Sequence, residues 1–285
     1  MEQIKNMKWV SGAVAALALL VSGCEGGATS DGSSSSSNGG LSSTGIAGST
    51  ARMVIVDNYL YAIAGNKIQL FDINTPSSPN PWNKITIDWD IQTLYPYENY
   101  LLVGAADGVH ILDNTDPASP RTVGDFTHAT AIDPVVASNG YAYVTLKNDP
   151  QAFNSVDDQM SVISLADPAN PVLKNVISMQ SPEGLSVVGD RLFVCDGIAG
   201  IKQFDLSDPE NPTIVDAVAR VNCNDVIAYE NILYAITDTS LQQYDYTMSP
   251  PVLLSIIETD EMSPDALLNL LGLGVQDSRL DINEL

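Results

Sequence analysis

The sequence predicts an all-β fold, a five-bladed β-propeller of four-stranded antiparallel blades with a short C-terminal helical tail. Three observations indicate it. An apolar strand that ends near an aspartate recurs along the chain, an apolar hairpin precedes each copy, and a proline-containing turn follows it. The recurring strands are IQLFD (68–72), VHILD (109–113), MSVIS (160–164), IKQFD (201–205) and LQQYD (241–245), with starts 41, 51, 41 and 40 residues apart. A strand-rich repeat of about 40 residues is typical of a propeller blade.

The first two strands of each blade are joined by a two-residue turn. The turns are Asp57-Asn58, Glu98-Asn99, Asn139-Gly140, Gly189-Asp190 and Glu230-Asn231. These residue types tolerate the positive φ that a tight hairpin needs. The second strands read YLYAI, YLLVG, YAYVT, RLFVC and ILYAI, and the aspartate-ending segment is the third strand.

The third and fourth strands are separated by a corner in which Asp or Thr precedes a proline and a second proline follows three residues later. Proline sets φ and cannot continue strand pairing, so we expect a loop of fixed shape. The fourth strands read WNKITI, RTVGDF, VLKNVI, TIVDAV and VLLSII. Two departures occur, since Ser164 replaces the strand-end aspartate and the last blade has YTMSPP in place of Asp-Pro.

The units VIVDNYLYAIAGNKIQLFDINTPSSP and VVGDRLFVCDGIAGIKQFDLSDPENP resemble the LVIVD repeat of secreted and surface bacterial β-propellers. The resemblance covers residues 51 to about 257. It implies the propeller fold and a location at the cell surface. Because the family has no single shared catalytic motif, the resemblance assigns no functional residue.

The N-terminus has the features of a signal peptide. Lys5 and Lys8 precede a short apolar run that ends at Gly23, and Cys24 follows. The end of the run resembles a bacterial lipobox, which implies cleavage after residue 23 and a lipid on Cys24. Glu25 follows where related inner-membrane lipoproteins carry Asp, so the resemblance implies the outer membrane. A plain secretory signal is the alternative.

Four segments are therefore expected. Residues 1–23 are a signal peptide with lipobox, and 24–50 are a lipidated cysteine followed by a Gly/Ser-rich flexible tether. Residues 51–257 form the propeller, and 258–285 form the tail. Within the tail, Ser263 and Pro264 are suited to a helix start before a leucine-rich stretch that we expect to cover an apolar end of the propeller.

The chain is strongly acidic, with 12 basic against 35 acidic residues and a formal charge of −23. Such a charge excludes nucleic acid as a partner and favours cationic partners or divalent ions, although solubility alone also explains it. The sequence contains no G-x-S-x-G, H-E-x-x-H or C-x-x-C-H motif, no phosphate-binding glycine loop, and two histidines. We therefore predict that the protein is not an enzyme and needs no cofactor, with calcium as a possible exception.

A ligand site, if present, is expected at one mouth of the central channel. The inner strands of the blades begin at Ala51, Gln92, Asp133, Glu183 and Asn224. Four of these side chains carry oxygen and would form a ring able to grip a polyol or, through Asp133 and Glu183, Ca²⁺; a solvated polar lining is the simpler alternative. Trp89, Asp90 and His128 lie in the connections on the same face, and so does the insertion KNDPQAFNSVDDQ (147–159).

Cys195 ends the second strand of the fourth blade, and Cys223 precedes the inner strand of the fifth. Both should lie in adjacent blades on the face that carries the connections between blades. An oxidising compartment would permit a disulfide between them. Two separate buried thiols are the alternative.

The favoured function is a non-catalytic, outer-membrane-anchored propeller that binds or scaffolds a protein or glycan in the cell envelope. The first alternative is a carbohydrate-active enzyme that uses Asp133 and Glu183, with Asp90 as a third candidate, as acid and base. The second is a purely structural subunit of an envelope complex.

Overall fold

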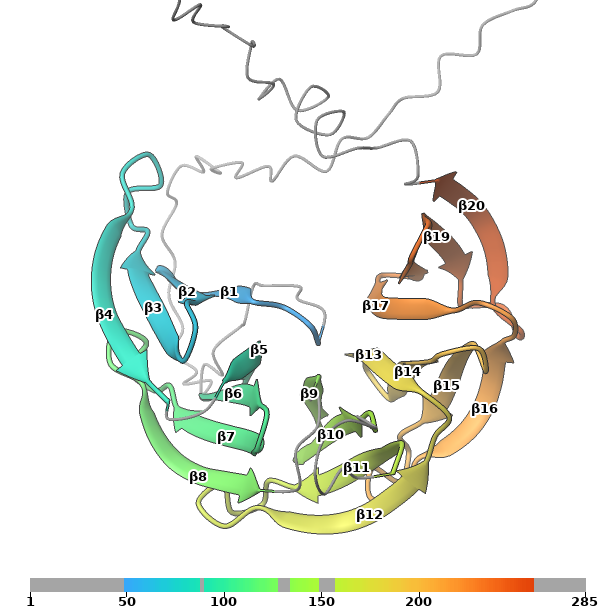
Figure 1. Cartoon of the computed structure of the whole chain (residues 1–285), viewed down its shortest axis with the longest axis horizontal. Helices are drawn as coiled ribbons and strands as arrows, with labels where there is room; N and C mark the ends of the chain where they lie inside the picture. Colours follow the sequence, from blue (N-terminus) through green and yellow to red (C-terminus); the bar gives the residue numbers. More distant parts are fainter. Residues whose placement is uncertain (1–48, 88–89, 128–133, 149–156, 259–285) are drawn as a thin grey trace, which may run out of the picture. The chain divides into compact units, whose positions relative to one another are not determined.

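The computed structural model describes residues 49–87, 90–127, 134–148 and 157–258. Within these ranges all regular secondary structure is β-strand, in five four-stranded antiparallel sheets. The all-β, five-bladed architecture expected from the sequence is confirmed (Figure 1). No helix that could cross a membrane occurs in the described ranges. The predicted signal peptide, Cys24 and the helix predicted in the tail lie outside them.

Each blade is one continuous stretch of chain whose strands follow one another from the inner to the outer edge of the sheet. Blade 1 consists of β1 (Met53–Val56), β2 (Tyr59–Ile63), β3 (Lys67–Asp72) and β4 (Asn80–Thr86). Blade 2 consists of β5 (Ile91–Tyr97), β6 (Tyr100–Ala105), β7 (Gly108–Asp113) and β8 (Arg121–Thr127). Blade 3 consists of β9 (Val135–Ser138), β10 (Tyr141–Leu146), β11 (Gln159–Ser164) and β12 (Val172–Ser178).

Blade 4 consists of β13 (Pro182–Val188), β14 (Arg191–Asp196), β15 (Ile201–Asp205) and β16 (Thr213–Val218). Blade 5 consists of β17 (Cys223–Tyr229), β18 (Ile232–Thr237), β19 (Ser240–Asp245) and β20 (Val252–Glu258). In every blade the register between the third and fourth strands shifts once. Such bulges bend a strand and increase its twist, as the outer edge of a propeller blade requires.

The inner hairpins are set by local backbone chemistry. The first turn residue of each blade lies in the left-handed region, with φ of 52° at Asp57, 51° at Glu98, 51° at Asn139, 54° at Gly189 and 52° at Glu230. The positive φ expected from the residue types is thus present in all five hairpins. This turn fixes the register of the first two strands.

The strand-end aspartates build the corners. An Oδ1 atom accepts the backbone N–H two residues later in four blades: Asp72 from Asn74 (2.8 Å), Asp113 from Thr115 (2.9 Å), Asp205 from Ser207 (2.7 Å) and Asp245 from Thr247 (2.8 Å). The hydroxyl of Ser164 accepts from Ala166 at 3.3 Å, so serine performs the same role in blade 3. Hydrogen bonds from the backbone and side chain two residues on lower the pKa of Asp113, Asp205 and Asp245.

Neighbouring blades pack face to face through apolar side chains. Between blades 1 and 2, for example, Tyr61 and Leu70 share a buried cluster with Leu101 and Leu112. A tyrosine hydroxyl at the same strand position ties two of the interfaces, because Tyr61 donates to Pro117 O (2.7 Å) and Tyr143 donates to Pro209 O (3.0 Å). Each of these prolines belongs to the corner of the next blade, so the repeated corner also serves as an inter-blade contact.

This face-to-face packing links the blades in order from 1 to 5. Within the described ranges, no comparable strand packing joins blade 5 back to blade 1 (Figure 1). One face of blade 5 and one face of blade 1 therefore lack a neighbouring blade. We call these two sheet faces the seam.

Candidate functional site

The inner strands are bridged by the residues that precede β1. Ser49 is fully buried, and its hydroxyl accepts a hydrogen bond from Leu185 N in blade 4 (2.7 Å). Thr50 donates its hydroxyl hydrogen to Asp225 Oδ2 in blade 5, and Ala51 O accepts from Leu94 N in blade 2 (2.9 Å). Residues 49–51, the N-terminal arm, thus contact three blades before the chain enters blade 1. They occupy part of the space that the inner strands enclose.

Asp225 of β17 lies close to Gly184 of the neighbouring inner strand β13. A Cβ added to Gly184 would come within 2.0 Å of Asp225 Oδ1, so glycine permits this approach. The same Oδ1 atom accepts Val226 N at 2.9 Å. Burial raises the pKa of Asp225, and the hydrogen bonds from Thr50 and Val226 oppose this effect.

The structure describes four of the five ring positions, and three of these four carry oxygen in their side chains. Gln92, Glu183 and Asn224 each lie near the start of an inner strand. The carboxylate of Glu183 forms an ion pair with Lys147 Nζ, and Asn224 Nδ2 donates to Asp238 Oδ1 at 2.7 Å. These polar groups are therefore held by protein partners.

The remaining predicted site residues are less informative. Asp90 is exposed, and its backbone oxygen accepts from Ala106 N (3.1 Å). Trp89, His128 and Asp133 lie outside the described residues, so the proposed calcium pair of Asp133 and Glu183 is not placed. Within the described ranges no group of three His, Cys, Asp or Glu side chains is suited to hold a metal ion.

The insertion of blade 3 is described only at its base. Asp158 Oδ1 accepts from Asn148 N at 2.7 Å, and Asp158 O accepts from Met179 N at 2.9 Å. The two ends of the insertion are thereby joined to each other and to the connection that leads into blade 4. Lys147, the partner of Glu183, directly precedes this base.

A disulfide joins blades 4 and 5 on the loop face, and a buried ion pair within blade 4 lies beside it. Cys195 and Cys223 form a disulfide with their Cα atoms 5.4 Å apart. Beside it, fully buried Asp196 accepts from Gln180 N (2.7 Å) and Ser181 N (2.9 Å) through Oδ1. Its Oδ2 forms an ion pair with Lys202. Asp196 thus joins the connection between blades 3 and 4 to strands β14 and β15 of blade 4.

Sequence reasoning missed Asp196, although a signal was present. At the matching position, just after the apolar second strand, blade 1 has Ala64 and blade 2 has Ala105. An aspartate that replaces a small residue in one repeat is unusual, because a buried carboxylate needs charged and hydrogen-bonding partners.

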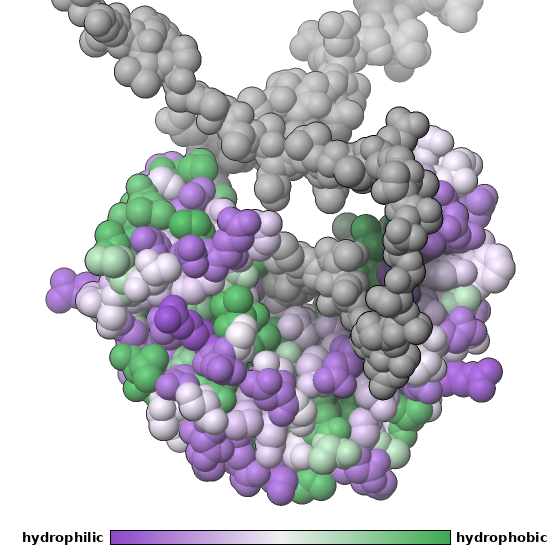
Figure 2. Space-filling model, turned by 180° about the vertical axis from the view of Figure 1, so that it is seen from behind, coloured by the Kyte–Doolittle hydropathy of each residue, from purple (hydrophilic) through white to green (hydrophobic). Residues whose placement is uncertain are grey.

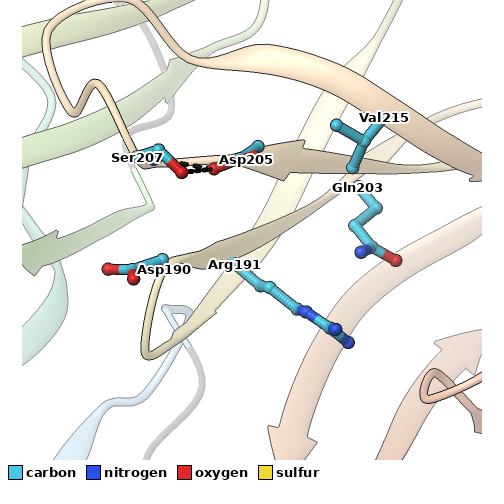
Figure 3. A pocket seen from close by; sticks show the side chains of 6 residues that line it. All are labelled: Asp190, Arg191, Gln203, Asp205, Ser207 and Val215. Atoms are coloured by element: carbon cyan, nitrogen blue, oxygen red, sulfur yellow. Dashed lines mark hydrogen bonds between the residues drawn. The ribbon is translucent and has the colours of Figure 1, made fainter.

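A pocket of about 340 Å³ lies on the opposite side of blade 4, where the hairpins and corners are (Figure 3). Its lining residues are Asp190, Arg191, Gln203, Asp205, Ser207 and Val215. Arg191 Nη1 donates to Tyr246 O at 2.9 Å, and its guanidinium lies 5.6 Å from the centre of the Tyr246 ring. Asp205 is bound to Ser207 within its corner. None of the residues predicted for the channel mouth lines this pocket.

Gln203 is a buried polar side chain among the residues that line this pocket. It occupies the β15 position at which β3, β7 and β11 carry the buried Leu70, Ile111 and Val162. Gln203 is itself buried, and its Oε1 atom has no hydrogen-bond partner within the described ranges. A core position that is apolar in blades 1, 2 and 3 is thus polar in blade 4.

The fold and the repeat together define a five-bladed β-propeller. The model of the LVIVD repeat family matches residues 47–84, a segment that includes the first three strands of blade 1 and most of β4. A comparison with curated proteins found no match.

Solved structures with a similar fold are distant in sequence. They include a hypothetical selenium-binding protein from Sulfolobus tokodaii (13% identity, 70% of this chain and 59% of that chain, TM-score 0.56). Apo AztD from Citrobacter koseri is similar at 14% identity over 73% of this chain and 62% of that chain, with a TM-score of 0.54. The computationally designed Ika8 protein is similar at 13% identity over 72% and 60%, with a TM-score of 0.53. The match thus spans about three fifths of these chains, and at this identity it shows the fold alone.

Proposed function

We propose that the protein is a non-catalytic binding or scaffold module of the bacterial cell envelope, anchored by lipid at Cys24 to the outer membrane. It binds a protein or glycan on the loop face, the face formed by the connections between blades and by the insertion of blade 3. The lipobox-like run before Cys24 and the residue Glu25 support the anchor and its membrane.

The observation that carries the binding role is the fixed pairing of polar side chains on this face. Lys147 is paired with Glu183, and Asn224 with Asp238. Groups already held in place lose little conformational freedom when a ligand binds, which favours affinity. Because the N-terminal arm occupies part of the channel, the ligand contacts the rim of the loop face.

The pairing of Glu183 also separates this proposal from a carbohydrate-active enzyme. A glycosidase needs two carboxyl groups that act as acid and as base or nucleophile. In the structure the carboxylate of Glu183 is instead engaged by Lys147. In the second alternative, a purely structural subunit, the same surface would bind other subunits of the complex.

Affinity capture from the native envelope, followed by mass spectrometry, tests the binding role. The lipidated protein is compared with a Lys147→Ala/Glu183→Ala variant, with a deletion of residues 150–158, and with Asp190→Asn as the control on the opposite face. We expect the partner to be lost from the first two and retained by the control. Turnover of a glycan panel without any enriched partner would show that the binding proposal is wrong.

The anchor is tested separately. Replacement of Cys24 by serine should move the protein from the membrane fraction to the soluble fraction of the envelope. Retention of this variant in the outer membrane would contradict lipid anchoring.

A further inference from the structure

On the blade 1 side of the seam, apolar side chains are exposed. The same positions are buried in a blade that packs against the blade before it. Met53 is 64% exposed, whereas Val226 at the same position of blade 5 is fully buried. Ile55 is 37% exposed, whereas the matching Ala228 is 8% exposed. This face of blade 1 therefore has the apolar composition of an inter-blade interface, although no blade packs on it within the described ranges.

The blade 5 side shows the same contrast. Ile236 is 45% exposed, whereas the matching Cys195 of blade 4 is fully buried against blade 5. Tyr234 occupies the position of Tyr61 and Tyr143, whose hydroxyls bind the corner of the next blade. Within the described ranges Tyr234 has no such partner.

The outer strand of blade 5, which lies at the end of the blade series, is also rich in exposed apolar side chains. Five of the seven β20 side chains are apolar and between 46% and 53% exposed: Val252, Leu253, Leu254, Ile256 and Ile257. Figure 2 shows hydrophobic side chains gathered at the end of the blade series to which β20 belongs. Exposed apolar surface of this kind marks a site of association.

The route of the chain indicates what covers the seam. After the outer strand of blades 3 and 4, short connections (179–181 and 219–222) lead to the inner strand of the next blade, beside the face that this blade packs against. The chain leaves β20 at Glu258, which pairs with Ser240 at the loop-face end of the blade. Continuing by the same route, it reaches the seam face of blade 5.

The sequence that follows is suited to that position. Seven of the ten residues 266–275 are apolar: Ala266, Leu267, Leu268, Leu270, Leu271, Leu273 and Val275. Residues 259–264 span at most about 20 Å when extended, enough to cross a blade face. Burial of leucine side chains against an apolar face contributes about 1.5–3 kcal/mol each.

We propose that residues 266–275 of the same chain dock on the seam, where they cover Ile236 and Tyr234 of blade 5 and Met53 and Ile55 of blade 1. The tail then acts as the element that closes the ring on its outer side, as the N-terminal arm bridges the blades on the inner side. This docking is independent of the ligand proposed for the loop face.

Site-specific photo-cross-linking in the full mature chain tests the docking. A benzoylphenylalanine replaces Ile236 on the seam, and in a control protein it replaces Ile214 on the outer strand of blade 4, which is 53% exposed. We expect Ile236→benzoylphenylalanine to form cross-links to residues 264–275 within one chain, and the control to form none. The cross-links should be lost when Leu267, Leu268, Leu270 and Leu271 are replaced by serine, and retained when Leu280 and Ile282 are replaced.

Three results would overturn the proposal. Cross-links from position 236 in a dimer band would identify a second copy as the occupant. Cross-links to a co-purified protein would identify an external partner. A folded, disulfide-bonded protein that forms no cross-link from position 236 would show that the seam is uncovered.

Discussion

The hydroxyl of Ser49 accepts a hydrogen bond from the backbone N–H of Leu185 at 2.7 Å, between residues that lie 136 positions apart in the chain. Ser49 is fully buried. The bond joins the residues before blade 1 to the inner strand of blade 4, on the far side of the seam. It therefore links the start of blade 1 directly to blade 4, which strand packing within the described ranges does not do.

Replacement of Ser49 by alanine should destabilise the propeller by about 1–3 kcal/mol, because it leaves the buried N–H of Leu185 without an acceptor. Denaturant unfolding measures the change. Ser77→Ala, at an exposed corner position, is the matched control and should unfold at the wild-type midpoint. Equal midpoints for both variants would contradict a stabilising role for the N-terminal arm.

Tyr143→Phe should destabilise the protein by about 1 kcal/mol, because it removes the hydrogen bond to Pro209 O that joins blades 3 and 4. Tyr234→Phe is the control at the same strand position, and we expect no measurable change because Tyr234 lacks a corner to bind. The two variants are compared by thermal unfolding. A larger loss for Tyr234→Phe than for Tyr143→Phe would show that the tyrosine position does not act through the corner of the next blade.

Asp225 should make stability depend on pH. Burial raises its pKa in the folded state, so the folded protein holds this proton more tightly than the unfolded chain, whose aspartates titrate near about 3.9. The folded state consequently loses stability as pH rises from that value through the raised pKa. Asp225→Asn, whose amide oxygen and nitrogen can still bind Val226 N and the Thr50 hydroxyl, should gain stability relative to wild type across this window.

Unfolding free energies of the two proteins at a series of pH values from about 3.5 to 7 test this expectation. Their difference isolates residue 225 from the other acidic groups. A constant difference across the series would contradict a raised pKa at Asp225.

The disulfide should contribute about 3–4 kcal/mol on the chain-entropy account, because Cys195 and Cys223 are 28 residues apart. Unfolding with and without reductant measures this contribution in a chain that begins after Cys24. Thiol titration of the same unfolded chain should find no free thiol before reduction and two after. Two free thiols in the unreduced sample would show that the bond is absent.

The hairpins and corners could be predicted from the sequence because each depends on residues that are adjacent in the chain. Glu98 and Asn99 form their turn through their own backbone conformation, and Asp205 accepts the N–H of Ser207 two positions later. Ser164 makes the same type of turn in the blade where the aspartate is missing. The repeat spacing then predicts the number of blades, since each unit provides one four-stranded sheet.

The candidate site was predictable only in part. The order of strands places Glu183 and Asn224 at the starts of inner strands, but it does not show that Lys147 and Asp238 hold them. The period also leaves open which core positions become polar. The sequence therefore shows Gln203 only as a strand residue, and the structure shows that it lines a pocket.

By itself, the sequence determined the class of fold, the five blades, the tight turns and the corners, because these follow from short-range backbone preferences repeated along the chain. Only the tertiary structure decided that Ser49 and Thr50 bridge distant blades, that Asp225 packs on Gly184 and that blades 5 and 1 leave a seam. The physical reason is that these features depend on the distance between residues far apart in the chain. That distance is set by the packing angle accumulated over all the blades, which no single repeat specifies.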